Sequence, residues 1–142
     1  MREERVDPFK ERLKEIFKDV RWEKRCYFAE VETDKLLDAI ARLAAVFGEI
    51  HLSTITATPV EDAVELSYIF WVYSEKKLLV VKVRVPKKEL RVASLVSLIP
   101  GALLYEGEAH DLVGVMFEGN PLMSRHVVLS DDIPEEDKPL AR

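Results

Sequence analysis

The chain has 142 residues, about one domain in length, and 48% of them are hydrophobic. Its 21 basic and 26 acidic side chains leave a formal net charge of −5. This balance argues against non-specific nucleic-acid binding, which depends on neutralising phosphates with Lys and Arg. No run approaches the roughly 20 apolar residues of a membrane-spanning helix, and MREERVDPFKERLKE lacks the apolar core of a signal peptide. We therefore expect a soluble intracellular protein.

Two features of the composition bear on chemistry and habitat. Cys26 is the single cysteine, so the chain alone cannot form a disulfide or supply the thiolates of an iron–sulfur cluster. We expect Cys26 to be a small buried residue of a strand. Asn120 is the single asparagine, glutamine is absent, and charged residues reach 33%. Depletion of thermolabile amides together with enrichment of charge is typical of hyperthermophilic proteins.

The first thirty residues predict a helix and a strand. Residues 7–19 carry apolar side chains at helical spacing, with Asp7 as the N-cap and Pro8 at the first helical position. Residues 26–32 alternate between apolar and charged side chains, which indicates a strand.

The clearest helix is predicted at residues 34–47, where the apolar residues form one stripe. Asp34 is placed to cap its start, and Gly48 is placed to end it in the left-handed conformation.

Three extended runs follow, at residues 50–57, 64–73 and 78–85. They are rich in β-branched and aromatic residues, which indicates strands. Only four polar residues, 74–77, connect the last two runs, so these strands should form a hairpin.

The C-terminal part predicts two further helices. Residues 92–99 match a short helix ended by Pro100 and Gly101, and residues 102–113 match another with Gly114 just past its end.

The whole chain, residues 1–142, therefore predicts a single α+β domain. Its sheet would have about four strands, antiparallel or mixed, with helices packed on one face. A short helix near the C-terminus would bear an acidic motif, and residues 130–142 would form a polar tail.

The stretch YEGEAHDLVGVMFEGNP concentrates the unusual residues. On a helix, Glu106 and His110 would share one face, and Glu108 and Asp111 another. Gly107 in the middle of a helix costs about 1 kcal/mol relative to alanine. Such local inconsistency between sequence and helix is typical of functional or interface positions.

Three interpretations of this cluster compete. A catalytic cluster of Glu106, Glu108 and His110 would need a pocket and a carboxylate with a raised pKa. A metal site would use the spacing of Glu106 and His110, but His51 and His126 fit no recognisable ligand pattern. In a docking element, the carboxylates would instead be held by arginines or backbone N–H groups of this chain or a partner.

The same stretch resembles the signature of the 30-kilodalton subunit family of respiratory complex I, whose members are also known as the C subunit of NADH dehydrogenase. The lead-in SLVSLIPGALLYE is also similar, with Ser94, Pro100 and Ala102 in place. The strong resemblance covers about residues 92–129. The residues that match the family signature are Glu106, Glu108, Asp111, Gly114, Phe117, Gly119, Pro121 and Arg125.

The chain departs from the family pattern at four clear positions. Gly107 stands where the family has the arginine of Glu-Arg-Glu, and Asn120 stands where it has a histidine before proline. Val113 replaces a common aromatic residue, and Ser124 replaces the first of two arginines. We expect a divergent branch with fewer charged contacts to neighbouring subunits.

The resemblance implies a subunit without cofactor or chemistry of its own, in the hydrophilic arm of a membrane-bound complex. It would dock on the subunit that corresponds to the large subunit of nickel–iron hydrogenases (the 49 kDa-like subunit of complex I), near a small iron–sulfur subunit. Iron–sulfur clusters, and nickel–iron in a hydrogenase, would lie in those partners. The complex would lie on the cytoplasmic side of the membrane, support electron transfer coupled to ion translocation, and bind no nucleic acid.

The compact length and thermophile-like composition favour an archaeal energy-converting hydrogenase-type complex over an NADH-oxidising one. On this hypothesis Glu106, Glu108 and Asp111 are satisfied by Arg125 and by basic groups of the neighbouring subunit. The alternatives are a free-standing enzyme that uses Glu106, Glu108 and His110, and a homo-oligomeric binding module.

Overall fold

The computed structural model describes residues 6–124, and the predictions for Arg125, His126 and residues 130–142 lie outside them. Short 3₁₀ turns occupy Thr33–Lys35, Lys87–Glu89 and Pro121–Ser124. The helices and strands, in chain order, are α1 (Pro8–Leu13), β1 (Lys18–Glu23), β2 (Cys26–Glu30), α2 (Leu36–Phe47), β3 (Ile50–Pro59), β4 (Ala63–Val72), β5 (Lys77–Pro86), β6 (Arg91–Ala93), α3 (Ala102–Val113) and β7 (Met116–Glu118).

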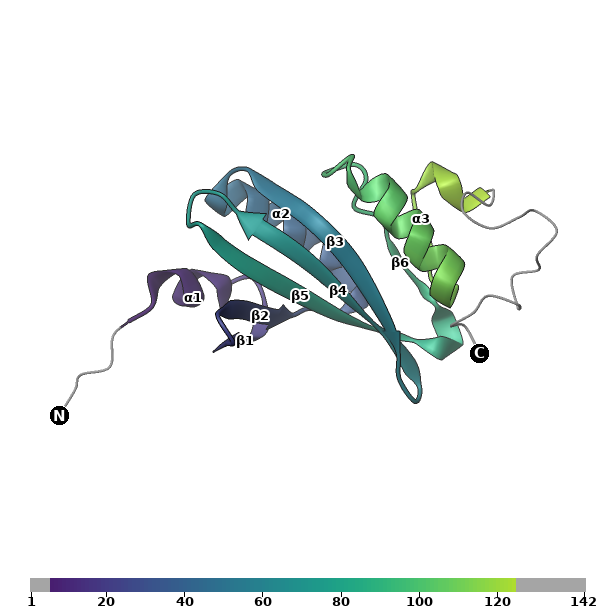
Figure 1. Ribbon diagram of the computed structural model, residues 1–142, viewed down its shortest axis with the longest axis horizontal. Helices are drawn as coiled ribbons and strands as arrows, with labels where there is room; N and C mark the ends of the chain where they lie inside the picture. Colours follow the sequence, from purple (N-terminus) through teal and green to yellow (C-terminus); the bar gives the residue numbers. More distant parts are fainter. Residues whose placement is uncertain (1–5, 125–142) are drawn as a thin grey trace.

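The main sheet has five strands in the order β1-β2-β5-β4-β3 (Figure 1). The predicted hairpin of β4 and β5 is confirmed, and β3 pairs antiparallel with β4. The sheet is mixed because β2 runs parallel to β5. A separate parallel pair joins β6 to β7. The predicted α+β class is therefore confirmed, with one more strand in the main sheet than expected.

Alternating side chains of β4 and β5 give the sheet one buried face. Leu66, Tyr68 and Phe70 of β4 are fully buried, while the residues between them are only partly buried. Helix α2 lies behind the sheet in Figure 1 and buries its apolar stripe, including Leu36, Ile40, Leu43 and Phe47. Burying each such side chain stabilises the fold by roughly 1.5–3 kcal/mol.

The predicted helix 7–19 was wrong in its second half. Helix α1 ends at Leu13, and the chain continues as the edge strand β1, which pairs with β2. Phe17 and Val20 are nevertheless buried, as the helical spacing suggested. They reach the same core from a turn and a strand, so apolar spacing alone did not distinguish the two conformations.

The predicted helix 92–99 was also wrong. Residues 91–93 form β6, and the chain then makes a single turn in which the N–H of Ile99 donates to the carbonyl of Leu95 (2.7 Å). The N–H of Ser94 donates to the carbonyl of Glu118, 2.8 Å away. Pairing with a strand more than twenty residues away in the sequence overrides the local helical pattern here.

Three smaller expectations need correction. Asp34 makes no capping hydrogen bond, because a 3₁₀ turn precedes α2 and Lys35 holds the N-cap position. Gly48 does end α2 at positive φ (82°), but its ψ of −142° lies outside the left-handed helical region. Cys26 is partly rather than fully buried.

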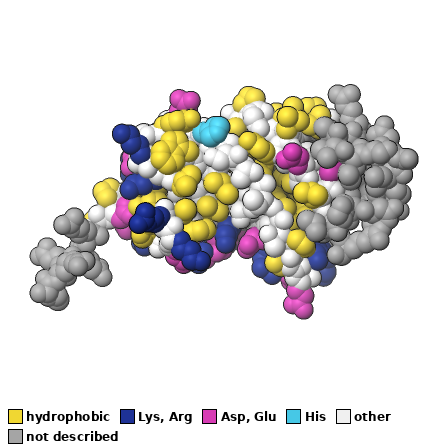
Figure 2. Space-filling model, in the orientation of Figure 1, with side chains coloured by type: hydrophobic (Ala, Val, Ile, Leu, Met, Phe, Trp, Pro, Cys, Tyr) yellow, Lys and Arg dark blue, Asp and Glu magenta, His cyan; other side chains and the backbone are white. Residues whose placement is uncertain are grey.

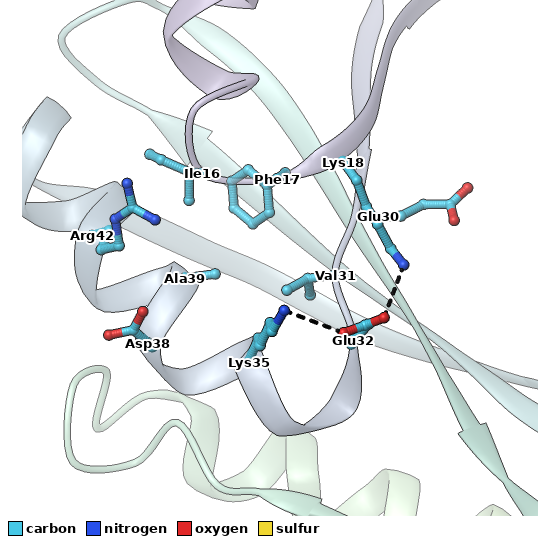
Figure 3. Close-up of a pocket in the computed structure, with 10 residues that line it drawn as sticks. All are labelled: Ile16, Phe17, Lys18, Glu30, Val31, Glu32, Lys35, Asp38, Ala39 and Arg42. Atoms are coloured by element: carbon cyan, nitrogen blue, oxygen red, sulfur yellow. Dashed lines mark hydrogen bonds and ion pairs between the residues drawn. The ribbon is translucent and has the colours of Figure 1, made fainter.

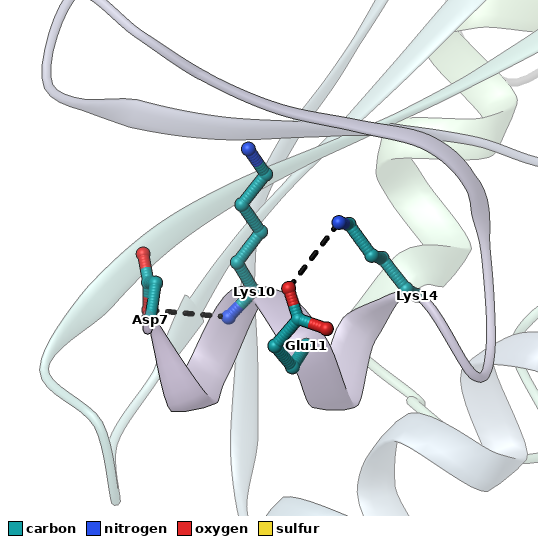
Figure 4. A network of polar contacts seen from close by, with 4 residues as sticks. All are labelled: Asp7, Lys10, Glu11 and Lys14. Atoms are coloured by element: carbon teal, nitrogen blue, oxygen red, sulfur yellow. Dashed lines mark hydrogen bonds and ion pairs between the residues drawn. The ribbon is translucent and has the colours of Figure 1, made fainter. Parts of the chain in front are cut away.

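Asp7 anchors the N-terminal helix to the sheet. Its Oδ1 accepts from the N–H of Lys10 at 3.2 Å (Figure 4), which confirms the predicted N-cap. Its Oδ2 accepts from the hydroxyl of Tyr27 at 2.6 Å. Partial burial opposes ionisation of Asp7, but the bonds from Tyr27 and Lys10 and the charge of Lys77 bring its pKa below the usual value. Burial and then Asp7 itself raise the pKa of Tyr27 to about 12.

Replacing Asp7 with alanine should therefore lower stability. We expect Asp7→Ala to lose about 1–2 kcal/mol of unfolding free energy at pH 7, the usual range for a lost N-cap. Because the folded-state pKa is lowered, this stabilisation is present above the unfolded pKa and is lost as pH falls through the folded value. Denaturant unfolding at pH 7 and pH 3 measures both effects.

Asp34→Ala is the matched control, since that carboxylate makes no cap. Its expected change is within about 0.5 kcal/mol. Equal losses for the two variants would contradict the assigned role of Asp7.

Candidate functional site

The family motif lies on a β6–α3–β7 unit in which the two strands run parallel. The carboxyl ends of parallel strands lie at the same edge of a sheet. Ser94 follows β6, and Gly119 and Asn120 follow β7, so these residues meet at one place. Helix α3 crosses between the strands and presents Glu106 to that meeting point.

Glu106 is fully buried and accepts three hydrogen bonds there. Its Oε1 accepts from the hydroxyl of Ser94 (2.6 Å) and from Nδ2 of Asn120 (2.9 Å), and its Oε2 accepts from the N–H of Leu95 (2.8 Å). These donors are uncharged and come from this chain, and the backbone N–H of Leu95 is of the kind predicted. The predicted pairing with Arg125 lies outside the described residues. The carboxylate thereby joins the segment after β6, helix α3 and the segment after β7.

Asn120 extends this connection. Its Nδ2 also donates to the carbonyl of Leu103 (3.1 Å), and its Oδ1 accepts from the N–H of Leu122 (2.8 Å). One side chain therefore fixes the 3₁₀ turn Pro121–Ser124 against α3. The amide that stands in place of the family's histidine thus has a structural role in this chain.

The environment of Glu106 is apolar beyond these donors. Burial raises the pKa of Glu106, while its bonds with Ser94, Leu95 and Asn120 act in the opposite direction. Tyr68 of β4 is also fully buried, and its hydroxyl has no hydrogen-bond partner within residues 6–124. Burial first, and then the charge of Glu106, raise the pKa of Tyr68 well above its usual value.

The backbone geometry and packing explain why glycine occupies two positions of this stretch, Gly114 of the motif and Gly107, which departs from it. Gly114 ends α3 in the left-handed conformation (φ 82°, ψ 8°), as predicted, and its N–H donates to the carbonyl of His110. At Gly107 a Cβ atom would lie 3.3 Å from Cδ1 of Leu122, so glycine lets the following turn pack closely on the helix.

The remaining motif residues divide between the interior and the surface. Asp111 and Phe117 are buried. His110 is buried too, and its Nδ1 lies 2.8 Å from the carbonyl oxygen of Val115. Pro121 and Glu108 are exposed, so the structure separates Glu108 from Glu106 and Asp111.

The outward side of α3 carries an apolar stripe with one charge in its middle. Leu104 and Leu112 are 60% and 46% exposed, and Glu108 lies one turn from each. We call Leu104, Glu108 and Leu112 the α3 stripe. A groove of about 430 Å³ runs beside it between α3 and the edge strand β3, where Ile50 and His51 line it.

A second hollow, of about 460 Å³, lies between β2 and α2 (Figure 3). Lys18 and Lys35 border it, and both pair with Glu32, at 3.3 and 3.5 Å. The hollow is lined by three cations, Lys18, Lys35 and Arg42, and by three carboxylates, Glu30, Glu32 and Asp38, so it has no excess of positive charge to bind an anion.

These positions decide what the acidic cluster can do. A general base must come within hydrogen-bond reach of its substrate, whereas Glu106 is enclosed with both oxygens already bonded. Glu108 lines the groove beside β3, where neither Glu106 nor His110 is exposed. Within residues 6–124, no group of three or more His, Cys, Asp or Glu side chains could hold a metal ion.

The partners of Glu106 were not predicted from the sequence. Ser94 appears there only as part of the lead-in, and Asn120 only as a departure from the family. Each is a polar side chain beside an apolar strand segment, which is a weak signal by itself. Their convergence depends on the parallel pairing of β6 and β7, which the predicted helix at 92–99 hid.

Comparison with known proteins decides the family. A model of the family described as "Respiratory-chain NADH dehydrogenase, 30 Kd subunit" matches residues 29–142. The chain belongs to this family. It is 31% identical over 131 residues to the C subunit of NADH-quinone oxidoreductase from Moorella thermoacetica, covering 89% of this chain and 88% of that protein. It is 29% identical over 107 residues to the C subunit of F(420)H(2) dehydrogenase from Methanosarcina mazei, and the match covers 74% of this chain and 67% of that protein.

Two solved structures share the fold. A chain of the membrane-bound sulfane sulfur reductase, an archaeal respiratory membrane complex, superposes with a TM-score of 0.75 at 25% identity, covering 94% of this chain and 83% of that one. A trypsin-resistant fragment of Nqo5 superposes with a TM-score of 0.68 at 19% identity, and the match covers 80% of this chain and 97% of that fragment. This 30 Kd family member is therefore similar to subunits of several oxidoreductase complexes. Between residues 6 and 124, no helix is long and apolar enough to cross a membrane.

Removing the charge of Glu106 tests its role in the fold of this family member. In Glu106→Gln the new amide N–H₂ would face the N–H of Leu95 or another donor, because all three present partners donate. We expect a loss of about 1–3 kcal/mol, the cost of buried donors left unsatisfied. Glu108→Gln, on the same helix but exposed, should change stability by less than about 0.5 kcal/mol.

The two variants should also differ in pH dependence. Because the folded-state pKa of Glu106 is raised, its contribution is greatest below the unfolded pKa and falls as pH rises through the folded pKa. The deficit of Glu106→Gln should therefore narrow as pH rises, as followed by denaturant unfolding from pH 4 to pH 8. A deficit that widened with pH would contradict the assigned environment.

Tyr68→Phe provides an independent check of the buried region. The hydroxyl that it removes is buried and has no partner in the described part of the chain, so its loss should be neutral or stabilising. A loss of more than about 1 kcal/mol in thermal or denaturant unfolding would show that this hydroxyl is hydrogen-bonded.

Proposed function

We propose that this protein is a non-catalytic, cofactor-free structural subunit in the hydrophilic arm of a membrane-bound respiratory complex. It docks on the subunit that corresponds to the large subunit of nickel–iron hydrogenases and so supports electron transfer coupled to ion translocation. Membership of the 30 Kd family and the names of the relatives, which are subunits of oxidoreductase complexes, support this proposal.

The α3 stripe is the observation that carries the docking role. Two large apolar side chains stay exposed on a helix whose opposite side is fixed by the buried Glu106. Exposed leucines next to a groove are typical of protein interfaces. Glu108 between them supplies one anion, which a lysine or arginine of the large subunit would pair with at the interface.

The type of complex is a finer proposal. Similarity to a chain of an archaeal respiratory membrane complex, together with the thermophile-like composition, favours an archaeal energy-converting complex. The iron–sulfur clusters, and any nickel–iron centre, belong to the large subunit and a small iron–sulfur subunit. The protein reaches the cytoplasmic side of the membrane only through those partners.

Reversing the charge of the α3 stripe tests the proposal. A tagged full-length chain is purified from gently solubilised membranes of a host that makes the complex, and the hydrogenase-like large subunit is quantified by mass spectrometry. We expect Glu108→Arg to reduce its recovery by about tenfold, as for the loss of about 1.4 kcal/mol of binding free energy. Glu15 is an exposed glutamate after α1, and Glu15→Arg is the control. This variant should recover as much of the large subunit as the wild-type chain does.

Circular dichroism should show that both variants keep the wild-type fold, since each site is exposed. Equal recovery of the large subunit with both variants would contradict docking through the α3 stripe. Purification of the wild-type chain without any other subunit would contradict the proposed function as a whole.

A further inference from the structure

The main sheet has a second side that no described helix covers. Its residues alternate along each strand with those of the core face, so register places their side chains together: Phe28 lies beside Val80, Ile69 also pairs with Val80, and Trp71 pairs with Leu78. We call Phe28, Ile69, Trp71, Leu78 and Val80 the open face. Figure 2 shows hydrophobic side chains gathered on this side of the molecule, which faces the viewer in Figure 1.

The open face is most exposed at one end. Leu78 is 37% exposed, and Tyr73, which follows β4, is 47% exposed. Aromatic residues that remain this exposed at a sheet end are typical of interfaces rather than of free surface.

A group of cations surrounds that same end. The turn between β1 and β2 carries Lys24 and Arg25, and the turn between β4 and β5 carries Lys76 and Lys77. The two turns are neighbours, because β2 pairs with β5 and Nζ of Lys77 lies 5.9 Å from the ring centre of Tyr27. Lys77 itself faces the other side of the sheet, where Tyr27 and Asp7 lie. We therefore call Arg21, Lys24, Arg25 and Lys76 the basic rim.

The basic rim stands out against the charge of the whole chain. Its four cations have Glu23 and Glu75 as acidic neighbours in the same segments, and Arg21 pairs with Glu23 at 3.6 Å. This leaves a local excess of two positive charges on a chain of net charge −5. Figure 2 shows Lys and Arg side chains along the margin of the hydrophobic patch. Three of them, Lys24, Arg25 and Lys76, have positive φ (50°, 68° and 55°), where glycine would be less strained.

We propose that the open face and its basic rim dock a second subunit of the same complex, one that presents an apolar patch with an acidic margin. Opposite charge around an apolar contact orients such a partner and speeds its association. This surface is distinct from the α3 stripe, which carries a single anion and lies beside the opposite edge strand, β3. The proposal rests on the proposed function, because it assigns a further neighbour within that complex.

Two other occupants fit less well. A second copy of this chain would bring two basic rims against each other, and like charges at an interface are unfavourable. A lipid surface would attract the cations, but the apolar side chains here lie on a strand surface interleaved with Ser67 and Lys82, two polar residues of β4 and β5. A protein surface matches that flat, mixed pattern.

The test uses the full-length chain in the purified complex, with a photo-crosslinking amino acid at Leu78. We expect irradiation to join position 78 to an Asp- or Glu-bordered apolar segment of another subunit, identified by peptide mass spectrometry. Lys24→Glu with Lys76→Glu should lower the cross-link yield by about tenfold at low salt and should abolish the fall of the wild-type yield with added salt, because salt screens the attraction that these lysines supply. Lys87→Glu with Lys88→Glu, at the opposite end of β5, is the matched control and should leave the yield unchanged.

Several results would overturn the inference. They are the absence of any cross-link to another subunit, a cross-link to residues 125–142 of this chain or to a second copy, and equal yields from the two double variants. So would binding of the isolated chain to vesicles of phosphatidylcholine and phosphatidylglycerol that is lost in Lys24→Glu with Lys76→Glu. Recovery of the large subunit in the same preparation separates these failures from a failure of the proposed function, because that recovery depends on the α3 stripe.

Discussion

The C-terminal part of this protein depends on the buried carboxylate of Glu106. Its two oxygens bind the segment after β6, through Ser94 and Leu95, and the segment after β7, through Asn120. A buried carboxylate is tolerated only when donors satisfy it, and here all three donors come from the ends of a parallel strand pair. The orientation of α3, and hence the direction in which Leu104, Glu108 and Leu112 point, follows from this one group.

This constraint explains why acidic residues with similar sequence spacing have different roles. Glu106 and Glu108 are two positions apart on one helix, so one points into the molecule and the other to solvent. The buried one is structural and the exposed one is available for a partner. Leu104 and Leu112 stay exposed on the same side of α3 as Glu108, where a partner subunit would bury them.

Much of this could be predicted from the sequence, and the failures share a physical cause. The bounds of α3, the strands β3 to β5 and the stop at Gly114 followed from local periodicity and glycine chemistry. The errors at residues 14–19 and 92–99 arose where pairing with a distant strand overrides the local pattern. The partners of Glu106 were missed for the same reason, since Ser94 and Asn120 converge only after β6 and β7 have paired.

The central claim is that the α3 stripe faces a partner subunit while Glu106 holds the helix from within. A cryo-electron microscopy map of the complex purified through this chain tests it most directly. We expect Leu104 and Leu112 to be buried against the hydrogenase-like large subunit, with a basic residue of that subunit beside Glu108. A map in which the outward side of α3 is open to solvent, while the chain is held elsewhere, would contradict it.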